Sequence, residues 1–116
     1  MDLEDVEIRK LIVYLRGTQV ILDRDLTRLY QVEVAQMNRQ VKRNIERFPE
    51  DFMFRITKDE YDSLKCHFGI SNLRGGDRSL PYVFTEQGVS MLAGLLRSQI
   101  AINANIAIIR AFTAMR

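Results

Sequence analysis

The segment from Leu22 to Phe48 most constrains the fold of this chain, because it contains two short helical patterns separated by a break. The first helix is predicted to start after Asp23, whose carboxylate can accept hydrogen bonds from the unpaired amide groups of a helix N-terminus. Residues 32–34 interrupt the pattern, since β-branched valines lose side-chain freedom in a helix. The segment therefore predicts a helix-turn-helix pair.

The second helix of the pair has an apolar face and a polar face. The predicted core-facing residues recur every three or four positions and are Val34, Met37, Val41, Ile45 and Phe48. The opposite face carries no acidic residue and consists of Gln36, Arg39, Gln40, Arg43 and Arg47, with Lys42 beside it. Arginine presents a planar fork to guanine or phosphate, glutamine can pair with adenine, and a helix fits the DNA major groove. The polar face therefore favours recognition of double-stranded DNA, and the alternative is a solvated face without a ligand.

Composition and charge agree with a basic domain. The 116 residues are 47% hydrophobic, which is enough for a single core. The formal net charge is only +2, but residues 8–116 hold all 17 basic residues and only 11 of the 15 acidic ones, so they carry a net charge of +6. A basic body favours a polyanionic partner.

The sequence lacks the signatures of several other classes of protein. Cys66 is the only cysteine and His67 the only histidine, so one chain cannot form a disulfide or a cysteine/histidine zinc site. Neither a phosphate-binding loop nor a nucleophile motif is present, and we expect no enzymatic activity and no cofactor. The acidic N-terminus is unlike a signal peptide, and no uncharged apolar run reaches the ~18 residues that a membrane span needs. A cytoplasmic location is therefore predicted.

The segments around the helix pair predict a small β-sheet. After an acidic lead-in over residues 1–8, the β-branched segments 11–15 and 19–22 flank Gly17 and predict a hairpin. A later strand is predicted over 52–56, in which Met53 and Arg55 point away from the core-facing Phe52, Phe54 and Ile56. Residues 82–84 predict another short strand.

Three further helices are predicted. Thr57 and Glu60 form a capping box before a helix over 58–67, whose inward-facing residues are Tyr61, Leu64 and Phe68. Thr85 caps a helix over 86–97, whose buried stripe is Val89, Leu92 and Leu96. The segment 98–116 is apolar on almost every side, so we expect it to lie partly in the core and partly in a subunit interface. A homodimer through this helix is therefore predicted.

The segment 69–81 is predicted to be an exposed loop, because it has no periodicity and is rich in Gly, Ser and Asn. Arg74 and Arg78 flank its paired glycines. Arginines on a sharply turning loop can reach a phosphate or the minor groove, as a wing does beside a recognition helix. The alternative is a solvated turn in which Asp77 pairs with an arginine.

Four runs of the sequence resemble the ORF-six N-terminal domain of phage and bacterial proteins, a relative of the KilA-N and Bro-N DNA-binding domains. The runs are RGTQVILDRDLTRLYQV, MNRQVKRNIERFPEDFMFRIT, RGGDRSLPYVFTEQGVSML and AINANIAIIRAFTAMR. The family pattern falls on Asn38, Val41, Lys42, Arg43, Asn44, 47–49, 74–76 and 84–88. The resemblance implies the DNA-binding domain of a phage or prophage transcriptional regulator or antirepressor, usually followed by a separate C-terminal domain.

Together these patterns predict one α+β domain over residues 1–116, with a helix-turn-helix pair, a small sheet, a loop as wing and packing helices. The residues expected to read base edges are Arg39, Arg43 and Gln36, followed by Gln40. The residues expected to contact phosphates or the neighbouring groove are Lys42, Arg47, Arg74 and Arg78. The alternative function is a protein-interaction module that binds a repressor or another phage or host regulator without contacting DNA.

Overall fold

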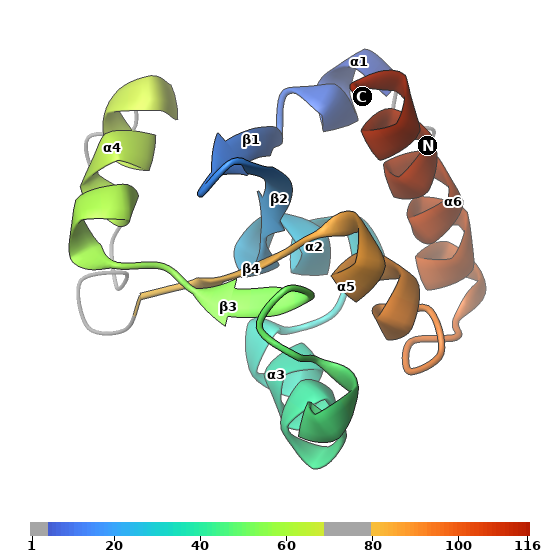
Figure 1. Ribbon diagram of the computed structural model, residues 1–116. Helices are drawn as coiled ribbons and strands as arrows, with labels where there is room; N and C mark the ends of the chain where they lie inside the picture. Colours follow the sequence, from blue (N-terminus) through green and yellow to red (C-terminus); the bar gives the residue numbers. More distant parts are fainter. Residues whose placement is uncertain (1–4, 69–79) are drawn as a thin grey trace.

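The computed structural model describes residues 5–68 and 80–116 and has the predicted α+β fold. Short strands are interspersed among the helices along these residues (Figure 1). Their order is α1 (Asp5–Arg9), β1 (Ile12–Leu15), β2 (Thr18–Leu22), α2 (Asp23–Tyr30), α3 (Val34–Arg43), the 3-10 helix η1 (Ile45–Arg47), β3 (Met53–Arg55), α4 (Lys58–Phe68), β4 (Tyr82–Phe84), α5 (Glu86–Leu92) and α6 (Gln99–Ala114). The predicted helix-turn-helix pair corresponds to α2 and α3.

The described strands form one antiparallel sheet in the order β1-β2-β4-β3. β1 and β2 are the predicted hairpin, and the φ angles of its two turn residues are 55° at Arg16 and 77° at Gly17. Positive φ at both positions is typical of a type I′ turn, whose twist matches that of the flanking strands. β4 follows β3 in the sequence but lies between β2 and β3, so it joins the hairpin to the segment after α3.

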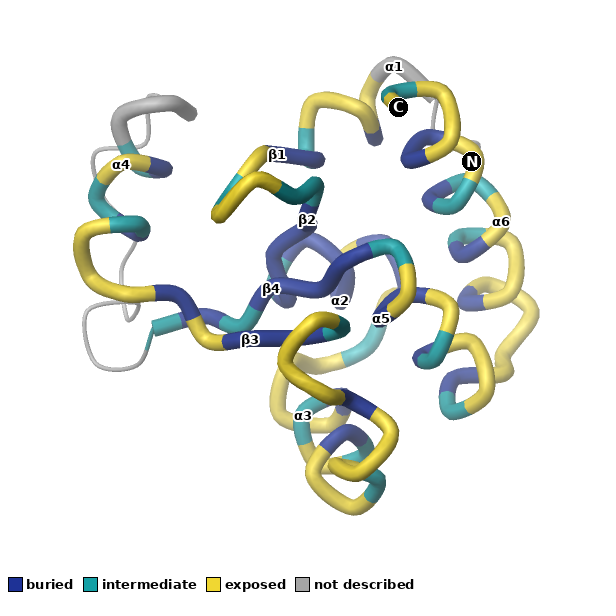
Figure 2. The backbone as a smooth tube through the Cα atoms, in the orientation of Figure 1, coloured by how far each residue is buried: buried dark blue, intermediate teal, exposed yellow. Residues whose placement is uncertain are grey.

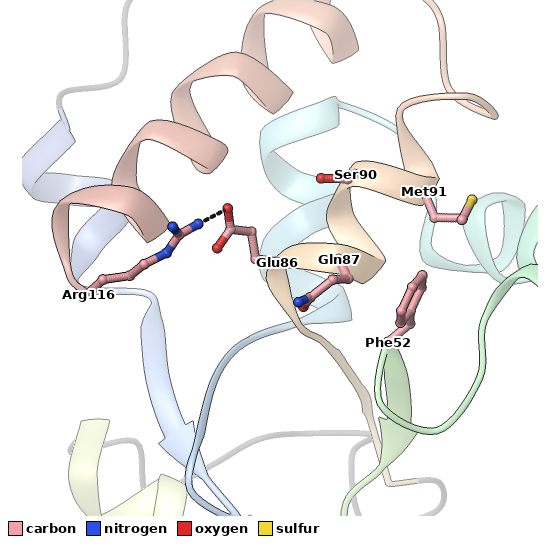
Figure 3. Close-up of a pocket in the computed structure, with 6 residues that line it drawn as sticks. All are labelled: Phe52, Glu86, Gln87, Ser90, Met91 and Arg116. Carbon is pink, nitrogen blue, oxygen red and sulfur yellow. Dashed lines mark hydrogen bonds and ion pairs between the residues drawn. The ribbon is translucent and has the colours of Figure 1, made fainter.

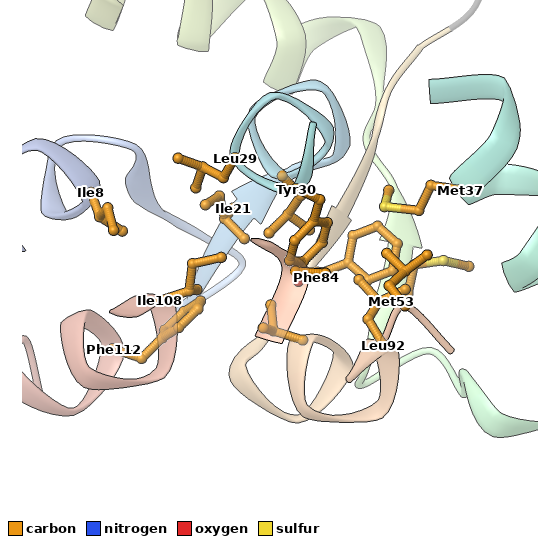
Figure 4. Packing of buried hydrophobic residues seen from close by; sticks show 14 of the residues in the cluster. Ile8, Ile21, Leu29, Tyr30, Met37, Met53, Phe84, Leu92, Ile108 and Phe112 are labelled. Atoms are coloured by element: carbon orange, nitrogen blue, oxygen red, sulfur yellow. The ribbon is translucent and has the colours of Figure 1, made fainter. Parts of the chain in front are cut away.

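Helices cover both faces of the sheet, and its central residues are buried on both sides, while the tip of the β1–β2 hairpin is exposed (Figure 2). One row of paired strand residues points into a core shared with α1, α2, α3, α5 and α6 (Figure 4), namely Ile12, Ile21, Phe84 and Met53. The next row packs with Tyr61 and Leu64 of α4 and consists of Leu22, Val83 and Phe54. The prediction that Met53 points away from the core is therefore wrong, because alternate residues of a strand face opposite sides and here both sides are covered.

The second helix of the pair is shorter than predicted. α3 ends at Arg43, where the side-chain amide of Asn44 donates to the carbonyl of Gln40 at 2.8 Å, and the chain continues as η1. The change of helix type takes Ile45 off the core-facing stripe, and its side chain is 54% exposed. Val34 is 38% exposed because it lies at the very start of α3. Both residues were predicted to face the core, whereas Met37, Val41 and Phe48 do so.

Other element boundaries also differ from the predicted ones. Leu22, not Asp23, is the N-cap of α2, and the Asp23 carboxylate instead accepts from the backbone amide of Tyr82 at 3.2 Å. The predicted helix over 86–97 stops at Leu92, followed by a turn, although Leu96 is buried as expected. Part of the acidic lead-in forms α1, which was not predicted and packs against α6.

Two predicted caps are present. At the start of α4, the amide of Glu60 donates to the Thr57 hydroxyl at 3.2 Å, and the Glu60 carboxylate accepts from the amide of Thr57 at 2.8 Å. At the start of α5, the amide of Gly88 donates to the Thr85 hydroxyl at 3.3 Å. Tyr61 and Leu64 of α4 are buried as predicted, while the side chain of Phe68 lies outside the described part of the chain.

Candidate nucleic-acid interface

α3 lies at one end of the molecule, far from α1 and α4 (Figure 1). Only two of its side chains are buried, Met37 and Val41, and both belong to the core that contains Phe84 and Leu92 (Figure 4). Most of its remaining residues are exposed (Figure 2). Most of the surface of α3 therefore faces solvent, and only a narrow stripe contacts the core.

Arg39 occupies the centre of this outer surface. Successive residues of an α-helix are rotated by about 100°, so Arg39 lies about 160° around the helix axis from each of the two buried residues, Met37 and Val41. The other fully exposed polar residues of α3 are Gln36, Lys42 and Arg43. Gln40 lies at one edge of the surface and Asn38 at the other, and both are half-buried. The structure thus brings together most of the side chains predicted to read base edges and leaves Gln40 peripheral.

We define the α3 face as the exposed residues that lie around Arg39, which are Ala35, Gln36, Arg39, Lys42 and Arg43. Sequence inspection missed Ala35 because it carries no polar group, although its spacing of four residues from Arg39 places it on the same face. No residue of the α3 face forms an ion pair with an acidic side chain within residues 5–68 and 80–116. Its cationic groups are therefore available to an anion.

The segment after α3 is exposed but firmly anchored. Arg47, predicted to contact phosphate, is exposed in η1. The next residue, Phe48, is buried, and its ring meets that of Phe84 edge-on with centroids 6.0 Å apart. Aromatic pairs in this arrangement contribute about 0.5 to 1.5 kcal/mol beyond burial. Phe48 therefore fixes the position of the chain that carries Arg47.

The turn between α2 and α3 is closed by backbone hydrogen bonds. Gln31 has a left-handed conformation with φ 58° and ψ 48°. Its amide donates to the carbonyl of Arg28 at 3.3 Å, and the amide of Val32 donates to the carbonyl of Thr27 at 3.0 Å. This pair of bonds is a Schellman motif, which ends a helix in a defined direction. The turn therefore sets the angle at which α3 leaves α2.

Two buried carboxylates lie at the start of α2. Burial raises the pKa of both Asp23 and Asp25 above the ordinary value of an aspartate. Arg28 opposes this shift at Asp25, whose carboxylate it contacts at 2.8 Å. Asp23 instead receives the backbone amide of Tyr82, so both carboxylates hold the framework together.

The segment from Phe84 to Gly88 joins α5 to the chain that follows α3. The Thr85 hydroxyl donates to the carbonyl oxygens of Asp51 and Phe52, at 3.0 and 3.2 Å. A Cβ atom on Gly88 would lie 2.2 Å from the carbonyl oxygen of Phe52, so only glycine fits at this position. These residues are framework, and the predicted wing residues Arg74 and Arg78 lie outside the described residues.

An open cavity of about 340 Å³ lies beside this segment (Figure 3). Its lining residues are Phe52, Glu86, Gln87, Ser90, Met91 and Arg116. The carboxylate of Glu86 and the guanidinium of Arg116 form an ion pair, so the two charges of the cavity neutralise each other. Within residues 5–68 and 80–116, no group of three or more His, Cys, Asp and Glu residues could hold a metal ion.

A comparison with protein families matches residues 10–95 to the ORF6N domain. The chain belongs to the ORF6N domain family. This is the family whose resemblance was noted in the sequence, and membership suggests a phage-type protein. No curated protein and no solved structure matched the chain.

The matched range separates the helices of this ORF6N domain into two groups. It includes α2, α3, η1, α4 and α5, and therefore the whole α3 face. α1 and α6 lie outside it and contact each other. No helix in the described part of the chain is both long and apolar enough to cross a membrane.

Proposed function

We propose that this ORF6N domain binds double-stranded DNA with α3 in the major groove. The observation that carries the proposal is the position of Arg39 at the centre of an outward surface flanked by Arg43 and Lys42, with no acidic partner among the described residues. A protruding helix of this kind matches the width of the major groove. Arginine at its centre can donate two hydrogen bonds to guanine.

The other residues of the surface receive roles from their place around Arg39. Arg43 and Gln36 lie beside it and can reach base edges, and the methyl group of Ala35 can contact a thymine methyl. Lys42 on the other side of Arg39, and Arg47 in η1, can reach the phosphates that border the groove. Gln40 is half-buried, so we give it a smaller part than the sequence suggested. Arg74 and Arg78 keep the wing role predicted from their loop.

The domain fits a phage- or prophage-type transcriptional regulator or antirepressor acting in the cytoplasm. Its role is binding, with no catalytic step. A second candidate is a protein-interaction module, and the exposed isoleucines of α6 favour it. The same residues support the homodimer predicted from the sequence. These two functions differ in their dependence on the α3 face.

The experiment that tests DNA binding selects sequences from a pool of random duplexes at a low and a higher salt concentration. The test variant is Arg39→Ala/Arg43→Ala. The matched control is Arg9→Ala/Lys10→Ala, which removes the same charge from two exposed residues at and just after the end of α1. Circular dichroism verifies that both variants fold.

We expect the wild type and the control to enrich one sequence, and the test variant to enrich none. Loss of a base-reading arginine is expected to cost about 1 to 3 kcal/mol, and affinity is expected to fall steeply with salt because phosphate contacts release counterions. If the test variant enriches the same sequence as the wild type and the control, α3 does not read the sequence and the proposal is overturned. If the wild type does not bind at low salt, the protein-interaction module replaces the proposal.

A further inference from the structure

Asn105 is an unusual residue on the buried side of α6. The other buried residues of this helix are apolar, namely Ala101, Ile108, Ala111 and Phe112. The Oδ1 atom of Asn105 accepts a hydrogen bond from the hydroxyl of Tyr30, and the two residues are only 6% and 1% exposed. The Nδ2 atom of Asn105 has no partner among the described residues. A buried amide with an unused donor costs free energy that an apolar residue would avoid, so packing alone does not explain Asn105.

Tyr30 lies where α2 ends and the turn to α3 begins. It is the last residue of α2, and α3 starts at Val34 after residues 31–33. The Schellman hydrogen bonds make this turn rigid, as described above. A change in the position of Tyr30 is therefore transmitted to the start of α3 through a very short connection.

The apolar contacts of α3 leave its orientation weakly determined. Met37 and Val41 are its buried side chains, and apolar burial has no preferred direction. A hydrogen bond is directional, and single buried polar residues can specify one arrangement of packed helices. The bond between Tyr30 and Asn105 supplies such a direction at the end of α2.

We propose that Asn105 is a positioning residue, which orients α3 by holding the hydroxyl of Tyr30. The effect of this hydrogen bond on the discrimination between DNA sequences rests on the proposed DNA binding, whereas its effect on the orientation of α3 does not. Asn105 lies outside the range matched to the ORF6N domain, and Tyr30 lies inside it. Through this bond, α6 acts on the helix that carries the α3 face.

The test uses the double variant Tyr30→Phe/Asn105→Leu, which removes the hydrogen bond and both polar groups together. An apolar pair of similar size is expected to keep the stability close to that of the wild type. The control is Asn103→Leu, which changes an exposed asparagine of the same helix that contacts Gln99 instead of Tyr30. If the double variant does not fold, Tyr30→Phe replaces it with the same measurements.

Two measurements are made on each protein. Residual dipolar couplings without DNA give the orientation of α3 relative to the sheet. The ratio of the Kd values for the selected duplex and for a scrambled duplex gives the discrimination. In the double variant, we expect the couplings of α3 to differ from the wild-type values, while those of the sheet remain unchanged. We expect the ratio of Kd values to show a loss of discrimination of about tenfold.

The results separate the possible roles of Asn105. An unchanged α3 orientation in the folded double variant overturns the positioning role, because α3 then keeps its orientation without the hydrogen bond. A changed orientation with wild-type discrimination also overturns it as a determinant of specificity. If the wild type binds no DNA, the proposed function fails, and the couplings still decide whether Asn105 orients α3.

Discussion

α3 and α6 are both surface helices, but they expose opposite kinds of side chain. α3 buries two residues and presents Arg39 and its neighbours to solvent. α6 buries five residues and exposes Ile100, Ile102 and Ile106, which are 46%, 41% and 47% exposed. A surface of cations that form no ion pair within the described residues suits a polyanion, whereas exposed isoleucines suit an apolar partner. The two helices therefore expose chemically different surfaces.

The two helices also differ in how they are held. α6 packs against α1, α2 and α5, and Phe112 is fully buried in that contact region. α3 contacts mainly α2 and inserts Met37 and Val41 into the core. α6 is therefore part of the framework of the fold, and α3 is a projecting element mounted on it.

The largest effects are expected when one buried side chain of α6 and one of α3 are truncated to alanine. Phe112→Ala should lower the free energy of unfolding by about 3 to 5 kcal/mol, because it leaves a large cavity between well-packed helices. Met37→Ala should cost about 2 to 3 kcal/mol, since α3 can shift to fill part of the space. Urea unfolding followed by circular dichroism measures both. An equal or larger loss for Met37→Ala would show that α3 is as much a part of the framework as α6.

The features of the fold that could be predicted from the sequence are those with local causes. The Gly17 turn, the capping box of Thr57 and Glu60, and the Thr85 cap each depend on residues close together in the chain. The burial of Met53 could not be predicted, because it depends on a second covered face of the sheet. α1 is likewise formed against α6, a helix from the far end of the chain.

The candidate site shows the same division. Periodicity placed Arg39 and Arg43 on the face opposite Met37 and Val41, and the structure has them there. It failed at Ile45, because the change from α-helix to 3-10 helix at Asn44 alters the angle between successive residues. The bond of Tyr30 to Asn105 joins segments far apart in the sequence, so no local pattern signals it.

The next largest effect tests the exposed side of α6. Ile102→Ser/Ile106→Ser should lower the stability of the diluted monomer by about 1 kcal/mol, because each side chain is still partly buried. Its main effect should be on self-association, which we expect for the wild type and not for the variant in sedimentation equilibrium. Val34→Ser/Ile45→Ser is the control, since it removes two exposed apolar residues near the α3 face. A wild type that remains monomeric at high concentration would contradict an interface between copies on α6.

The smallest expected effect tests the turn that supports α3. Gln31 has φ 58°, a conformation that costs a residue with a side chain about 1 to 2 kcal/mol and costs glycine far less. Because glycine also loses more backbone freedom on folding, Gln31→Gly should raise the free energy of unfolding by a net of about 0.5 to 1 kcal/mol. Ala35→Gly is the matched control, and because Ala35 lies in the first turn of α3 it should be destabilising by less than the roughly 1 kcal/mol of a helix interior. If urea unfolding shows Gln31→Gly to be destabilising, contacts of the glutamine side chain stabilise the turn in addition to its backbone hydrogen bonds. α3 would then be held more firmly to the rest of the fold than its two buried side chains indicate.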